Sequence, residues 1–234
     1  MGYRSRALCT GAAAIALVAI ALSGCVDERA FYIQQNQVPQ AGCQLTTDEV
    51  KFNSRGLLDV SVGVGYTLFP LVKLEALSSK ATDQEPERNA LDMRKFIVSL
   101  DMEGVPGSYP LEQTSFEVLS SGGIVPGGAQ VTEVKIVPDA LAQALQGVVA
   151  PGTAYTLVAA VTAVGVRRGT GSEIESTEFF YPVELCSGCL VAPVTACPAD
   201  TTGLPTNECG LPQDDPVTCC TLSTGQITCL DGSS

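Results

Sequence analysis

The residues with the clearest capacity for chemistry are cysteines, of which the chain has ten. Cys186 and Cys189 are separated by Ser and Gly, which is the spacing of pairs that exchange disulfides through a thiolate. Redox pairs of this kind begin a helix, because the helix N-terminus lowers the thiol pKa. Here the pair follows a strand-like run and precedes Leu-Val-Ala-Pro, which favours a structural role. A thiol–disulfide oxidoreductase or chaperone that uses Cys186 and Cys189 is therefore an alternative function rather than the favoured one.

The chain lacks the residues that several other catalytic and metal-binding chemistries require. The chain has no His, which excludes a Ser-His-Asp triad, a Cys-His dyad and a His-ligated metal. Zinc needs four ligands, usually as two close pairs, and a second Cys-x-x-Cys is missing. Asp214-Asp215 and Asp48-Glu49 lack the spacing of a calcium-binding loop. A hydrolase that uses carboxylates alone stays as a second alternative, and we predict no catalytic residue, no metal and no cofactor.

The first 26 residues have the pattern of an export signal. Arg4 and Arg6 precede an uncharged stretch over residues 7–26, whose compact apolar part ends at Leu22-Ser23-Gly24-Cys25. A basic start, a short apolar run and small residues are typical of a cleaved signal rather than a spanning helix. The last four residues resemble the lipobox of bacterial lipoproteins. That resemblance implies that residues 1–24 are removed and that Cys25 becomes the N-terminus, carrying acyl chains such as palmitate.

The resemblance also implies a location. Several acyl chains on one Cys bind a bilayer durably, where a single chain is marginal. Val26, not an acidic residue, follows Cys25, so by analogy with lipoprotein sorting the usual inner-membrane retention signal is missing. We expect a lipid-anchored outer-membrane protein of the cell envelope, and the sequence leaves open whether it faces the periplasm or the surface.

The charge of the chain narrows its partners. Loss of Arg4 and Arg6 with the signal leaves 11 basic and 25 acidic residues, a formal charge of −14. This balance argues against nucleic acid, because phosphate binding needs concentrated Lys and Arg. We interpret the acidity as a solubility feature of an exported protein. The expected partners are the membrane, through the lipid, and an unidentified envelope protein or polymer.

Eight cysteines remain when Cys9 and Cys25 are set aside. An even number in an exported chain predicts disulfides, and seven of the eight lie in the last 49 residues, in a tail with little apolar periodicity. Covalent links must therefore supply much of the order of the tail. The predicted disulfide residues are Cys43, Cys186, Cys189, Cys197, Cys209, Cys219, Cys220 and Cys229.

Two features of the disulfide pattern follow from the spacing. Cys43 has no local partner and must reach the tail, and we predict that it pairs with Cys186 or Cys189, which would fasten both ends of the main domain. Adjacent Cys219 and Cys220 are expected to pair outward with different partners rather than with each other.

Alternation of apolar and polar residues predicts strands across residues 41–190. The clearest strand spans 58–68, others span 95–102 and 132–137, and a long hairpin over 151–185 turns at 167–171. Residues 138–147 predict one short helix, with Asp139 as its N-cap and Gly147 at its end. Residues 83–92 and 120–128 are predicted loops.

The start of that hairpin, Pro151-Gly-Thr-Ala-Tyr155, resembles the entry into the penultimate strand of fibronectin type III and related immunoglobulin-like sandwiches. The resemblance gives Tyr155 the structural role of a tyrosine corner, whose hydroxyl bonds back to the preceding turn. The chain departs from the family in having no Trp for the core. We predict a mainly β fold, an immunoglobulin/fibronectin III-like β-sandwich with one short helix, and a small sheet closed on itself as the alternative.

These predictions divide the chain into a signal (1–24), a lipid-anchored tether (25–40), a β-sandwich domain (41–190) and a disulfide-rich, irregular tail (191–234). The predicted function is non-enzymatic: a lipid-anchored envelope protein that serves as an interaction or structural module. Sandwiches often bind through the loops at their ends, which makes 83–92 and 120–128 candidate binding loops.

Overall fold

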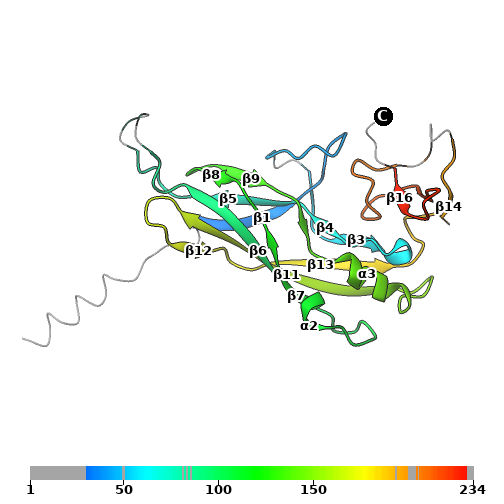
Figure 1. Ribbon diagram of the computed structural model, residues 1–234. Helices are drawn as coiled ribbons and strands as arrows, with labels where there is room; N and C mark the ends of the chain where they lie inside the picture. Colours follow the sequence, from blue (N-terminus) through cyan, green and yellow to red (C-terminus); the bar gives the residue numbers. More distant parts are fainter. Residues whose placement is uncertain are drawn as a thin grey trace, which may run out of the picture.

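The computed structural model describes residues 30–48, 51–80, 82, 84, 86–192, 194–199, 204 and 206–230. The predicted signal and Cys25 lie outside these residues. The described chain is mainly β, with two large sheets and two small ones (Figure 1). The prediction of a mainly β fold is confirmed. None of the described helices is long and apolar enough to cross a membrane.

The smaller of the two large sheets has the strand order β2-β1-β5-β9, and every pairing in it is antiparallel. Its strands are β1 (Phe31–Gln37), β2 (Phe52–Asn53), β5 (Pro70–Leu74) and β9 (Ala129–Val131). Phe31 and Ile33 of β1 are buried in the core, so β1 is an integral strand. The predicted tether is therefore wrong over 31–37, where a short Phe-Tyr-Ile segment supplies an apolar face.

The larger sheet has the order β3-β13-β11-β6-β7, with β12 beside β11 and β8 beside β6. Its strands are β3 (Gly56–Asp59), β6 (Leu91–Asp101), β7 (Ser115–Leu119), β8 (Gly123–Ile124), β11 (Tyr155–Arg167), β12 (Glu173–Glu175) and β13 (Phe179–Cys186). The β11–β13 register runs from Tyr155–Leu185 to Val161–Phe179, which confirms the predicted hairpin. The predicted strand over 95–102 is also confirmed, although it begins earlier, within the predicted loop over 83–92. Only β3 pairs in parallel here, with β13.

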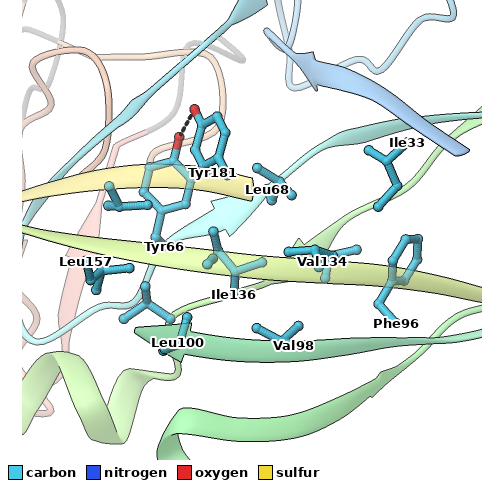
Figure 2. Packing of buried hydrophobic residues seen from close by; sticks show 14 of the residues in the cluster. Ile33, Tyr66, Leu68, Phe96, Val98, Leu100, Val134, Ile136, Leu157 and Tyr181 are labelled. Atoms are coloured by element: carbon cyan, nitrogen blue, oxygen red, sulfur yellow. Dashed lines mark hydrogen bonds between the residues drawn. The ribbon is translucent and has the colours of Figure 1, made fainter. Parts of the chain in front are cut away.

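The main core lies between the two large sheets. Figure 2 shows Ile33 of the smaller sheet in one cluster with Phe96, Val98 and Leu157 of the larger sheet. Phe96, Val98 and Leu157 are fully buried. Each buried side chain of this size contributes about 1.5–3 kcal/mol through removal of apolar surface from water. The two sheets are thus held face to face by one continuous apolar layer.

The predicted strand over 58–68 is wrong in its middle. The chain leaves β3 after Asp59, makes a 3-10 turn over Val60–Val62, and returns as β4 (Thr67–Leu68), which pairs with β10 (Val134–Lys135). Gly63 takes a left-handed φ of 68°, and the Asp59 carboxylate accepts the Ser61 N–H at 3.0 Å, which together bend the backbone. The alternating pattern assigned Asp59 and Thr67 to the solvent-exposed face of a strand, but both residues are completely buried. The pattern was therefore not that of a strand with one exposed face.

The predicted helix is confirmed as α3 (Asp139–Gln146), which ends at Gly147. The prediction that Asp139 caps it is wrong, because Pro138 holds the N-cap position and no side chain caps the helix. The Asp139 carboxylate instead accepts the Gly65 N–H and the Lys135 ammonium, each at 2.8 Å. Asp139 therefore ties the helix to the chain between the 3-10 turn and β4.

Three further departures concern short elements. A second short helix, α2 (Leu111–Thr114), precedes β7, so one helix was too few. The predicted loop over 120–128 contains β8, and the predicted strand over 132–137 is reduced to β10. The tail is not irregular throughout, since β14 (Thr195–Ala196), β15 (Cys219–Thr221) and β16 (Ile227–Cys229) form a small sheet. This sheet lies at the end of the sandwich opposite the start of β1 (Figure 1).

Candidate functional site

The most elaborate polar site of the described chain is the junction where the tail meets the sandwich. Residues 211–215 run beside β3, and Leu58 forms a β-bridge with Gln213. The Asp59 N–H donates to the Pro212 carbonyl at 2.9 Å, and the Asp214 N–H donates to the Leu57 carbonyl at 2.8 Å. The tail thus adds a short extended segment to the edge of the larger sheet, and we refer to residues 211–215 as the docking segment.

Gln213 joins the docking segment to β4. Its side-chain amide donates to the Thr67 carbonyl at 2.7 Å and accepts the Thr67 N–H at 2.8 Å. Both residues are buried, and a buried backbone N–H or C=O needs a partner. The amide of Gln213 therefore satisfies the backbone of Thr67 in the way that a neighbouring strand would.

Asp214 begins a buried chain of hydrogen bonds. Its carboxylate accepts the Leu57 N–H at 3.0 Å and the Tyr66 hydroxyl at 2.9 Å. The Tyr66 and Tyr181 hydroxyls are 3.0 Å apart, as drawn in Figure 2, and Asn36 donates its amide to the Tyr181 oxygen at 2.8 Å. Because the Tyr66 proton goes to the carboxylate, Tyr181 must donate to Tyr66. All the hydrogen bonds of this network can therefore form at once, with protons donated from Asn36 through Tyr181 and Tyr66 to Asp214.

Burial sets the protonation of this network. Burial, followed by the negative charge of Asp214, raises the pKa of Tyr66 well above its usual value. Burial likewise raises the pKa of Tyr181 to about 12. Burial also raises the pKa of Asp214 from 3.8, although hydrogen bonds from Leu57 and Tyr66 oppose that effect. Both phenols are therefore neutral proton donors near neutral pH, suited to holding a carboxylate rather than to acting as bases.

A disulfide fastens the junction from the other side. Cys43 pairs with Cys209. Cys209 lies just before the docking segment, whose last residue, Asp215, follows it by six residues. The prediction that Cys43 reaches the tail is confirmed, but the predicted partners, Cys186 and Cys189, are wrong. These two residues pair with each other, because a local loop brings them together at the end of β13.

The Cys186–Cys189 loop encloses Asp59. The Asp59 carboxylate accepts backbone N–H groups of Ser61 and Gly188 on one oxygen, and of Leu190 and Val191 on the other, all at 2.8–3.0 Å. Burial alone would raise the pKa of Asp59, but the four N–H bonds have the larger combined effect, so the pKa lies below its usual value. Asp59 is therefore a charged residue that organises the loop.

This carboxylate also determines what the two sulfurs can do. The ligand atoms of Asp59, Cys186 and Cys189 lie within 4.8 Å of one another, as a metal site would need. Both Asp59 oxygens already accept two bonds, and the sulfurs are bonded to each other. A fixed negative charge beside a thiol disfavours the thiolate that redox and metal chemistry require. The geometry suits a structural disulfide.

The last two disulfides hold the tail sheet together. Cys197 pairs with Cys220, and Cys219 pairs with Cys229, which lies opposite it in the β15–β16 register. The prediction that adjacent Cys219 and Cys220 pair outward is confirmed. Val62 of the 3-10 turn packs with Val191, Val217 and Cys219 in a second apolar cluster, so the tail sheet also contacts the sandwich through apolar surface.

Two hollows border Asp214. One, of about 60 Å³, is lined by Asn53, Glu208, Asp214 and Asp215 among others, well below the roughly 300–1,000 Å³ of ligand pockets. The other, toward Phe52, has a volume of about 510 Å³ and is lined by both Glu184 and Asp214, but it is wide open to solvent. Glu208 and Asp215 are exposed, so the described carboxylates here do not converge in an enclosed cleft.

The remaining predicted site residue is Tyr155, which begins β11. Its half-buried ring packs against the main core. Of the hydrogen bonds in the described chain, none comes from its hydroxyl, and the preceding turn is closed by Thr153, whose hydroxyl donates to the Ala150 carbonyl at 2.6 Å. Sequence reasoning missed Tyr66 and Tyr181 as polar residues, because an alternating apolar pattern treats a buried Tyr as core.

Comparisons of the chain with protein-family models, with curated proteins and with solved structures gave no match.

Proposed function

We propose that this chain is a lipid-anchored protein of the outer membrane that acts without catalysis, as an interaction or structural module of the cell envelope. The lipobox at Cys25 supports the anchor. Four disulfides among the eight remaining cysteines support an oxidising compartment. The partner is an envelope protein or polymer.

The observation that carries the proposal is the placement of the two ends of the described chain. β1 starts at one end of the sandwich, and the disulfide-bonded tail covers the other (Figure 1). A lipid on Cys25 would hold the first end near the bilayer and present the tail away from it. The docking segment and Cys43–Cys209 make the tail a rigid surface rather than a loose extension.

We further propose that the sandwich has immunoglobulin-like topology. In that fold one sheet contains the first, second and fifth strands, and the other contains the third, sixth and seventh. β1, β5 and β9 match the first set, and β6, β11 and β13 match the second, with β7 beside β6 as in variable-type domains. Folds of this class present rigid surfaces for binding, which is fold-level support for a binding role.

The two enzymatic alternatives have weaker support. An oxidoreductase would need a reactive thiolate, and the Asp59 carboxylate beside Cys186 and Cys189 opposes one. A carboxylate hydrolase would need paired acids in an enclosed cleft, whereas the acids around Asp214 border a hollow of about 60 Å³ and a larger depression that is open to solvent.

Crosslinking in intact membranes, followed by purification and mass spectrometry, tests the binding role. Reversal of charge on the tail surface, with Glu208→Lys and Asp215→Lys, should reduce the yield of the crosslinked partner. Reversal of two exposed acids on the side of the sandwich, with Glu103→Lys and Glu112→Lys, is the matched control and should leave the yield unchanged. Equal yields from both double variants would contradict a binding surface on the tail.

Two further measurements test the rest of the proposal. Cys25→Ser should release the protein from membranes and block removal of the signal, and a processed, membrane-bound variant would contradict the anchor. Thiol titration of the native protein should find no free or readily reduced pair. A reactive Cys186 and Cys189 pair with a low pKa would favour the oxidoreductase instead.

A further inference from the structure

The structure places an upper limit on the distance between the proposed lipid and the sandwich. Ala30 already belongs to the fold, since its carbonyl accepts the Glu75 N–H at 2.6 Å. Cys25 precedes Ala30 by five residues, and five residues span at most about 18 Å in any conformation. The end of the sandwich where β1 starts, which we call the proximal end, must therefore stay close to the bilayer surface if Cys25 carries the lipid.

The proximal end exposes apolar side chains. Leu77, in the connection that follows β5, is 88% exposed, and Val125, after β8, is 54% exposed. Their segments meet at the end of β5, because the Gly127 N–H donates to the Leu74 carbonyl at 2.7 Å. An isolated exposed Leu is ordinary in a soluble protein, but two apolar side chains within reach of a bilayer match an interfacial surface.

Basic residues gather at the same end. Lys80 and Arg88 are exposed there, as is Arg168, whose guanidinium is paired with Asp92 at 2.7 Å. The Gly169 N–H donates to the Arg88 carbonyl at 2.7 Å, which places the β11–β12 turn beside the connection between β5 and β6. The tail, by contrast, has no Lys or Arg after Cys186. Acidic Glu75 and Asp92 lie at the same end, so Lys80 and Arg88 are local positive sites and do not make this end positive overall.

From these three observations we infer that the proximal end docks on the bilayer itself, with Leu77 and Val125 in the interfacial layer and Lys80 and Arg88 near lipid phosphates. The inference rests on the proposed lipid anchor. Apolar side chains gain free energy in the interface, and basic side chains are attracted to anionic lipid within a Debye length. Docking would fix the sandwich upright, with the acidic tail farthest from the membrane.

The natural absence of Trp allows a direct test. Leu77→Trp and Val125→Trp place single fluorophores at the proximal end, and Leu222→Trp, at an exposed position of the tail, is the matched control. The lipidated full-length mature protein is reconstituted into vesicles of neutral and anionic phospholipid that contain brominated lipid. Emission from either proximal fluorophore should shift to shorter wavelength and be quenched several-fold more than emission from the tail.

Charge reversal tests the electrostatic part. Lys80→Glu with Arg88→Glu in the Leu77→Trp background should reduce quenching by anionic vesicles, whereas Lys51→Glu with Arg55→Glu should not. An unchanged signal with the first pair would overturn the role of basic residues.

The remaining outcomes also decide the inference. Solvent-like emission at both proximal positions in vesicle-bound protein would overturn it, as would equal quenching at the tail. Protection of the Leu77→Trp fluorophore in native membranes but not in protein-free vesicles would mean that the proximal end contacts a protein instead. Failure of the anchor is recognised separately, because Cys25 would then carry no acyl mass and the protein would not stay with the vesicles.

Discussion

Gln213→Ala tests whether the docking segment is part of the folding unit. The substitution removes both hydrogen bonds to Thr67, whose backbone is fully buried. A buried donor or acceptor left without a partner costs about 1–3 kcal/mol, so the two groups together predict a loss of about 2–6 kcal/mol. This is a large part of the roughly 5–15 kcal/mol that stabilises a domain.

The assay is urea-induced unfolding with the disulfides intact, followed by circular dichroism. Gln213→Met preserves the side-chain volume but not the two bonds, and it should lose nearly as much stability as Gln213→Ala. Gln146→Ala is the matched control, because its amide makes one exposed bond to the Ser61 carbonyl. Such surface changes alter the free energy of unfolding by about 0.5 kcal/mol or less.

Hydrogen exchange locates the effect. The Thr67 amide should lose protection in Gln213→Met, whereas the amides of the β11–β13 ladder should keep theirs. If Gln213→Met and Gln146→Ala change stability equally, and Thr67 stays protected, the side chain of Gln213 does not substitute for a strand and our description of the junction is incorrect.

Three further predictions concern the residues that hold distant segments together. Replacing both cysteines of the Cys43–Cys209 disulfide by Ser, which opens a loop with a sequence separation of 166, should lower the free energy of unfolding by about 5 kcal/mol in the chain-entropy model, measured in urea; a loss below about 1 kcal/mol would contradict it. Asp59→Asn should cost about 2–6 kcal/mol at neutral pH, because two of its four N–H donors lose their acceptor. The pKa of Asp59 is lowered in the fold, so its contribution is present above pH 3.8 and lost as the pH falls through the folded pKa; a difference from wild type that persists unchanged at lower pH would refute this. Gly65→Ala should prevent folding or strongly lower the melting temperature, because a Cβ there would collide with the Val137 carbonyl, whereas Gly225→Ala, with open space around it but a left-handed φ of 83°, should cost only about 1 kcal/mol.

The sequence predicted the parts of the fold that depend on local pattern. The β11–β13 hairpin combines long alternation with a Gly-containing turn, and α3 combines helix-forming residues with a terminal Gly, so both signals lie within the segments themselves. The strand over 58–68 failed for the opposite reason. Its bend depends on Asp59, whose acceptor capacity is filled by N–H groups of Gly188, Leu190 and Val191, which are 129 to 132 residues away in the chain. No local period contains that information.

The disulfides show the same difference between features set by local sequence and features set by long-range contacts. Counting showed that Cys43 must reach the tail, because no other partner was near it in the chain. Counting does not choose among seven partners, and that choice follows from the docking segment, which brings Cys209 beside Cys43. The Cys186–Cys189 pair forms locally because Asp59 gathers the loop between them. The cysteines of the candidate site were therefore predictable, but their pairing was not, and neither were the buried polar residues Gln213, Tyr66 and Tyr181.

The buried carboxylates also change the meaning of the acidic composition. In the described chain, Asp59, Glu87 and Asp214 each accept hydrogen bonds that join segments far apart or close a loop, and none of the three takes part in an ion pair there. Hydrogen bonds from Ser78 and Ser79 hold the pKa of Glu87 at about 2. These residues act through oriented N–H and O–H groups, which are less sensitive to salt than exposed charge pairs are. The acidity of this protein is thus not only a solubility feature, because carboxylates also serve as acceptors for backbone N–H groups. Asp214, Asp59 and Glu87 hold in place the tail, the Cys186–Cys189 loop and the connection between β5 and β6, respectively.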